Sequence, residues 1–188
     1  KSFLTVTSLA FALMVGGGSY VLSQIDKLAK PMAERIASDA LGVRVTIGAM
    51  AISLQEKRVD VHNIRIGNAG GFSKPHAVTI DNARVGLQSV AEGLIDFKTV
   101  QVNGTQVFLE VKPSGTNLHA LREGIKGSEA REATDKVMKV ILREFTLGNT
   151  QINPSVTLLS EQDMEPIEIA PMSLRGFGVK EDGFVASE

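Results

Sequence analysis

An uncharged run of twenty residues, from Phe3 to Leu22, constrains this chain more than any other feature of its sequence. At ~1.5 Å per helical residue such a run extends ~30 Å, the thickness of a bilayer's hydrocarbon core. The apolar part of a cleavable signal peptide is shorter, about 7 to 15 residues. Residues 1–24 are therefore predicted to form a transmembrane anchor, with a cleaved signal peptide and a buried core helix as the two alternatives.

The next segment, residues 25–42, is predicted to be a membrane-proximal amphipathic helix. Ile25, Leu28, Met32 and Ile36 recur at roughly helical spacing, and charged residues occupy the rest of the cylinder. The pattern stops at Gly42. A plain capping helix of the following domain is an equally good reading of this pattern.

From Val43 the apolar period changes to two, which is typical of half-buried strands. The short links Gln55–Lys57 and Asn103-Gly104 favour antiparallel connections. Val61 followed by Ile64 breaks the alternation and predicts a bulge that changes the inward face. Residues 43–188 are thus predicted to form one β-sheet domain, with a helical insertion near 117–139.

An internal similarity supports a repeated unit within this sheet. Ile95 to Val107 and Ile141 to Ile152 both contain alternating apolar residues, an Asn/Gly pair and a Thr-Gln dipeptide. The notable pairs are Thr105-Gln106 and Thr150-Gln151. The similarity predicts two copies of a strand, tight turn and strand.

Composition excludes several classes of function. The 20 basic and 21 acidic residues form no basic cluster, which argues against a nucleic-acid partner, and the lack of cysteine excludes thiolate chemistry. His62 and His76 have no acidic residue or histidine at metal-ligand spacing, and His119 has only Glu123. We therefore predict no catalytic residues, metal site or cofactor, and a protein that is not an enzyme.

Several short sequence segments, taken in their order along the chain, resemble those of a known family. The segments are Leu41–Gly48, Ile52–Leu54, Val61–Asn68, Gly70–Phe72 and Val102–Val107. Preceded by a single N-terminal span, this order resembles the N-terminal region of AsmA-like proteins over roughly residues 1 to 121. The resemblance implies a single-pass protein of the bacterial inner membrane whose C-terminal domain lies in the periplasm. It also implies a curved β-sheet with an apolar trough, similar to the chorein-type bridge proteins that conduct phospholipid.

Together these observations predict an α+β fold class, in which a transmembrane helix precedes a curved, mainly antiparallel sheet of about eight strands with short covering helices. Eight strands at ~4.8 Å extend only ~40 Å, so the chain is too short to bridge two membranes alone. The predicted partners are membrane lipid and, through the sheet edges, further copies or other envelope proteins.

Two functions follow from this fold. The first is phospholipid handling along an apolar β-groove, and the second is a non-enzymatic accessory or scaffold subunit whose sheet is covered by its own helices. The sequence leaves open whether the apolar face accepts acyl chains or is covered by the protein's own helices. The predicted lining of the groove is Val59, Val61, Ile80, Val85, Leu87, Ile95, Phe97, Val100, Val102, Val107 and Leu109.

Overall fold

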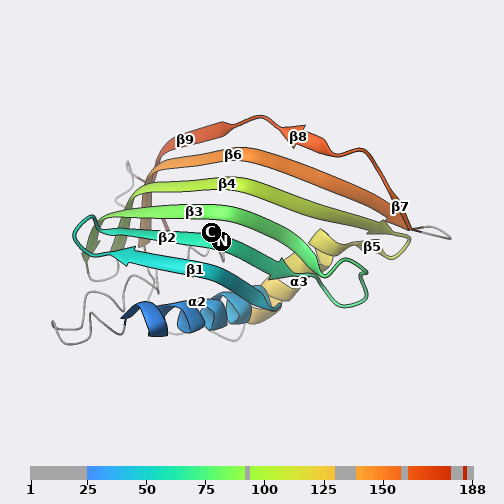
Figure 1. Cartoon of the computed structure of the whole chain (residues 1–188), viewed down its shortest axis with the longest axis horizontal. Coiled ribbons are helices and arrows are strands. Elements are labelled where there is room, and N and C mark those ends of the chain that lie inside the picture. The colour runs from blue at the N-terminus through green and yellow to red at the C-terminus, as the bar shows by residue number, and fades with distance from the viewer. Residues whose placement is uncertain (1–24, 92–93, 130–138, 158–160, 179–183, 186–188) are drawn as a thin grey trace.

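The computed structural model describes residues 25–91, 94–129, 139–157, 161–178 and 184–185. These residues form one mixed sheet and two helices. Figure 1 shows the strands side by side in an arched sheet, with α2 alongside β1 at one edge and β8 and β9 at the opposite edge. The described elements are α2 (Ile25–Leu41), β1 (Val45–Ser53), β2 (Arg58–Gly67), β3 (His76–Ala91), β4 (Leu94–Lys112), β5 (Gly115–Thr116), α3 (Asn117–Glu129), β6 (Lys139–Thr157), β7 (Glu161–Asp163), β8 (Ile167–Ile169), β9 (Met172–Phe177) and β10 (Phe184–Val185).

The order of the long strands is β1-β2-β3-β4-β6. β1 to β4 pair antiparallel, whereas β4 and β6 are parallel over almost their whole length. The connection between these two strands contains α3, and a parallel pair requires such a long connection because the chain must return to the same end of the sheet. Beyond β6, the short strands β7 to β10 each pair antiparallel with a different part of it.

The predicted fold class is therefore wrong. The sheet is mixed and has ten strands over the described residues, not a mainly antiparallel arrangement of about eight. The internal similarity has a different origin from the one predicted, because the two similar segments lie side by side. The parallel pairing runs from Leu94 beside Lys139 to Val111 beside Val156, a constant offset of 45 residues.

The predicted turn at Asn103-Gly104 lies instead in the middle of β4. Gly104 has a φ of +67°, and a Cβ there would overlap the carboxyl group of Asp81 on β3. Asn63 on β2 and Asn149 on β6 also have a positive φ, and the strand register places both in the same row as Gly104. A residue in this conformation interrupts side-chain alternation and bends a strand.

Val61 and Ile64 are both buried, on either side of Asn63. The change of inward face predicted between them is thus confirmed, but the predicted bulge is wrong. The pairing of β2 with β3 keeps its register across this point, because both strands change phase at the same row. The sheet therefore bends there without losing its hydrogen-bonded ladder.

Apolar side chains line up in rows across one face of the sheet, called here the apolar face. Burial along a row decreases toward β9: Val100 on β4 is 3% exposed, whereas Leu174 on β9 is 57% exposed. The protein core accordingly lies over β2, β3 and β4. Two of the rows are Val59, Val85, Val100, Phe145 and Leu174, and Val61, Ala83, Val102, Leu147 and Met172.

The two helices lie toward one side of the sheet. α2 packs on β1 and on α3, and α3 packs on β4 and β5. Ala33 and Ala37 of α2 are buried and lie one turn apart, and their small side chains allow the helix to approach the sheet closely. The helices leave the β8 and β9 end of the apolar face exposed.

The predicted transmembrane anchor, residues 1–24, lies outside the described residues. Within the ranges described above, neither helix combines the length and apolar character needed to cross a membrane. α2 starts at Ile25 and continues through Pro31 as a single helix.

Candidate functional site: the apolar face and its two edges

All eleven predicted groove residues lie on the apolar face. β2 and β3 carry five of them, and β4 carries the other six. Nine are buried, with Phe97 at 0% and Ile95 at 1% exposure, while Val107 and Leu109 are half-buried. The structure thus brings these residues together, and their role in lipid binding stays a prediction.

Sequence reasoning missed the residues that continue this face on β6, β8 and β9. Leu142, Phe145 and Leu147 of β6 are half-buried and pack against the core. Beyond them the apolar side chains are exposed, by 47% to 57%. The alternation within β9 was a usable signal, but nothing in the sequence places this segment beside β6. The exposed residues of the face are Ile167, Met172, Leu174 and Phe177.

The first part of the β1 edge, from Val45 to Gly48, is closed by side chains of α2. Ser38 Oγ accepts a hydrogen bond from the amide of Val45 (2.8 Å), and Glu34 Oε1 accepts one from the amide of Ile47 (2.6 Å). Lys30 Nζ donates to the carbonyl oxygen of Gly48 (3.2 Å). Lys30, Glu34 and Ser38 are spaced by four residues and so form one stripe of the helix. This stripe takes the place of a neighbouring strand.

The opposite edge is formed by β7, β8 and β9, which pair with β6 on their inner side. Pro166 and Pro171 lie in the breaks between these short strands, and neither can donate a backbone hydrogen bond. The six residues of β9 are therefore the longest stretch of this edge able to pair with another strand. Arg175 of β9 binds Glu144 of β6 at 2.9 Å, and both are on the face opposite to Leu174.

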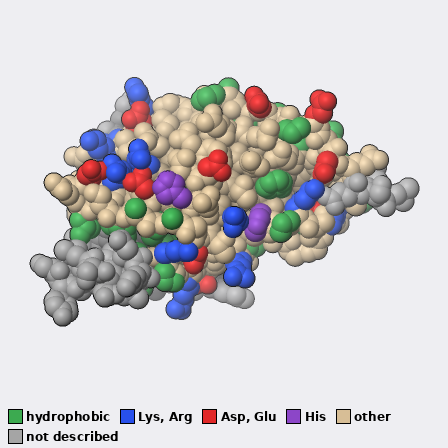
Figure 2. Space-filling view, viewed as in Figure 1, with side chains coloured by type: hydrophobic (Ala, Val, Ile, Leu, Met, Phe, Trp, Pro, Cys, Tyr) green, Lys and Arg blue, Asp and Glu red, His purple; other side chains and the backbone are tan. Residues whose placement is uncertain are grey.

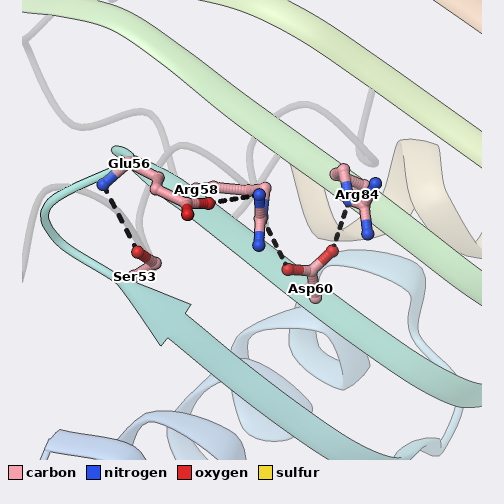
Figure 3. A network of polar contacts seen from close by, with 5 residues as sticks. All are labelled: Ser53, Glu56, Arg58, Asp60 and Arg84. Atoms are coloured by element: carbon pink, nitrogen blue, oxygen red, sulfur yellow. Dashed lines mark hydrogen bonds and ion pairs between the residues drawn. The ribbon is translucent and has the colours of Figure 1, made fainter.

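The other face of the sheet, called here the polar face, carries a compact charged network (Figure 3). Asp60 accepts hydrogen bonds from Arg58 Nε (2.8 Å) and Arg84 Nε (2.6 Å), and Arg58 also pairs with Glu56. Burial by itself would raise the pKa of Asp60, but the bonds from Arg84 and Arg58 outweigh it and lower the pKa. Two guanidinium groups are thus balanced by two carboxylates. Their arrangement ties the β1–β2 hairpin to β3.

On the side of the molecule that Figure 2 presents, charged side chains do not gather by sign. Figure 2 shows basic and acidic side chains dispersed over the side of the molecule that it presents. This mixture of signs favours an ordinary solvated surface over an electrostatic binding site. The chemistry that distinguishes this chain is therefore the extent of its apolar face.

A buried carboxylate fixes the loop between β2 and β3. Glu110, 1% exposed, accepts hydrogen bonds from Ser73 Oγ (2.6 Å), the Ser73 amide (2.8 Å) and the Lys74 amide (2.9 Å), and from Asn68. Burial opposes ionisation, but these bonds, led by those from Ser73, prevail and lower the pKa of Glu110. Asn117, the first residue of α3, accepts from the Glu110 amide (2.9 Å). The carboxylate holds together the loop, β4 and the start of α3.

Groups of three or more histidine and acidic residues that could hold a metal ion do not occur in the part of the chain that the structure describes. No protein-family model, curated protein or solved structure matches the chain. The resemblance to AsmA-like proteins accordingly stays a prediction from the sequence.

Proposed function

We propose that this chain is an AsmA-like protein that handles phospholipid at the periplasmic side of a bacterial inner membrane. In this proposal the apolar run of residues 3–22 attaches the domain to the membrane. Acyl chains bind on the apolar face, at its β6, β8 and β9 end. The sequence resemblance supports the family, and the exposed end of the apolar face supports the activity.

The observation that carries the proposal is the loss of cover along each apolar row. Phe97, Leu142 and Phe177 are direct neighbours on β4, β6 and β9, and their exposure rises from 0% at Phe97 to 54% at Phe177. A core that ends at a sheet edge normally ends in polar side chains, because exposed apolar patches are unfavourable unless they bind something. Here the rows reach the last strand still apolar.

The dimensions of this end suit an acyl chain. The six residues of β9 span ~20 Å, which exceeds the ~15 Å depth of one leaflet's hydrocarbon. Each methylene group removed from water contributes about 0.8 kcal/mol. Cover of about ten methylenes would therefore supply ~8 kcal/mol before the entropic costs of binding.

Any assembly through the sheet would use the β9 edge. A sheet of this width is too narrow to connect two membranes, and α2 already occupies the backbone hydrogen-bonding groups of β1 at Val45, Ile47 and Gly48. We therefore expect a further copy or another envelope protein to extend the sheet at β9 alone.

Native mass spectrometry of the detergent-extracted full chain tests the proposal. We expect the wild type to retain phospholipid and Leu174→Asp to retain several-fold less, because a carboxylate on the apolar face must be desolvated against the acyl chain. Ser173→Asp is the matched control, since this neighbouring residue points to the polar face. A lipid-free wild type, or equal retention by the two variants, would contradict phospholipid handling.

A scaffold function is the second candidate, favoured by the complete burial of the central rows. Ile95 and Phe97 belong to a filled core that offers no surface to a lipid. If this function is correct, the extracted protein carries no lipid and is instead recovered in a stoichiometric complex with another envelope protein.

A further inference from the structure

Two threonines interrupt the apolar face. Thr105 of β4 and Thr150 of β6 are direct neighbours in the parallel pair, each 8% exposed. Neither hydroxyl has a hydrogen-bond partner among the described residues. The other members of this row are isoleucines: Ile47, Ile64, Ile80 and Ile169.

An unpaired buried hydroxyl is unfavourable, and buried polar groups are nearly always hydrogen-bonded. Valine has the same branched shape as threonine and would fill this row without a polar atom. Two such hydroxyls on adjacent strands, facing the same side, therefore indicate a partner that supplies acceptor atoms at this level. Thr150 lies one strand in from the half-buried Ile169 of β8 at the edge of the sheet, so a ligand bound at that edge reaches it first.

The surroundings restrict the chemistry of that partner. The row on one side contains Val102 and Leu147, and the row on the other side contains Val107 and Ile152. A phosphate group would have to be buried among these apolar side chains without a neighbouring cation, which is costly. A neutral ester carbonyl accepts a hydrogen bond and is flanked by hydrocarbon in a diacyl lipid.

We propose that Thr105 and Thr150 donate hydrogen bonds to the ester carbonyl oxygens of a bound diacyl phospholipid. This inference rests on the proposed lipid function and assigns the position of the ligand along the sheet. The acyl chains lie at the β6, β8 and β9 end of the apolar face, along the direction of β9. The phosphate headgroup lies beyond the exposed β8 and β9 edge, in solvent.

A competition between ester-linked and ether-linked phosphatidylcholine of equal chain length tests the assignment. The full chain is incubated with mixed micelles of both lipids, and the bound ratio is read by native mass spectrometry. We expect the wild type to favour the ester lipid by about tenfold, the ratio given by two hydrogen bonds of ordinary net strength. Thr105→Val/Thr150→Val should bind both lipids equally, with ether-lipid binding unchanged.

Thr79→Val/Thr146→Val is the control, because these threonines occupy the polar face of β3 and β6 and should keep the wild-type ratio. Equal binding of both lipids by the wild type would overturn the assignment and leave the lipid function standing. Absence of both lipids from the wild type would overturn the lipid function itself.

A second measurement needs no lipid. In delipidated protein, Thr105→Val/Thr150→Val should raise Tm above that of the wild type, because two unpaired hydroxyls are removed without loss of packing. A lower Tm would show that the hydroxyls already have partners within the protein, and would overturn the assignment.

Discussion

The two edges of this sheet differ in what covers them. At the β1 edge, the helix α2 packs alongside the strand and its side chains bind the amides of Val45 and Ile47 and the carbonyl of Gly48. At the β9 edge, the last strand presents Met172, Leu174 and Phe177 on the apolar face, each about half exposed. One edge is finished within the chain, and the other still has unburied apolar surface.

Because of this difference, the two edges are not equally available for pairing with another strand. An open sheet edge is a template for another strand, and proteins usually protect both edges against uncontrolled pairing. Protection of β1 alone prevents the chain from stacking head to tail, because each added copy would need a free β1. Binding of lipid and pairing with a partner are therefore expected at the same end.

The strongest test of the contrast compares two phenylalanines of one row. Phe97→Ala should lower the free energy of unfolding by about 4 kcal/mol, because a large side chain leaves a filled core. Phe177→Ala, at the exposed end of that row, should cost less than about 1 kcal/mol. Urea unfolding of the two variants measures the difference. Equal losses would mean that β9 belongs to the core as firmly as β4 does.

Opening the closed edge should have the next largest effect. Glu34→Ala/Ser38→Ala removes the acceptors of two strand amides and should cost about 2 to 3 kcal/mol. It should also make the protein self-associate through β1, which sedimentation velocity would detect as a concentration-dependent dimer. Arg35→Ala/Asp39→Ala removes an exposed ion pair of the same helix and is expected to change stability by less than about 0.5 kcal/mol. If Glu34→Ala/Ser38→Ala stays monomeric and is as stable as the control variant, α2 does not protect this edge.

The third test removes the buried carboxylate of Glu110 and follows the stability of the protein with pH. Because the pKa of Glu110 is lowered in the folded protein, its contribution is complete above the unfolded pKa of about 4.5 and is lost as pH falls through the lower folded value. Glu110→Gln should cost about 2 kcal/mol at pH 7 and remove this part of the acid dependence. Glu144→Gln, which breaks the ion pair with Arg175, is the control for loss of a carboxylate and should cost less than about 1 kcal/mol at pH 7. Parallel pH profiles for the wild type and Glu110→Gln would argue against a special role for Glu110.

The local features of this fold could be predicted from the sequence because they depend on nearby residues. The hairpin around Gln55–Lys57 and the phase change between Val61 and Ile64 are both present. The parallel pairing of β4 and β6 could not be predicted, because it depends on the path that the chain takes between the end of β4 and the start of β6. The Thr-Gln repeat contained that information as a constant offset, but a hairpin explains such a repeat equally well.

Burial was also misjudged where the partner was distant in sequence. Asp96 is out of phase with the apolar residues of its strand, a position that is typical of a solvated carboxylate. It is 5% exposed and accepts bidentate hydrogen bonds from Arg143, at 2.8 and 2.5 Å. Arg143 reaches it only because β6 lies beside β4, so the misjudged burial and the missed pairing have the same cause.

The row of left-handed residues that crosses the sheet at Asn63, Gly104 and Asn149 works as a crease. Because β2, β4 and β6 all change direction at this row, the strands stay hydrogen-bonded to one another on both sides of it, and apolar side chains continue to face inward. Such a crease cannot be moved one strand at a time. A one-residue insertion or deletion in a single strand would place its bend out of line with those of its neighbours, so the lengths of β2, β4 and β6 between their ends and this row are tied to one another.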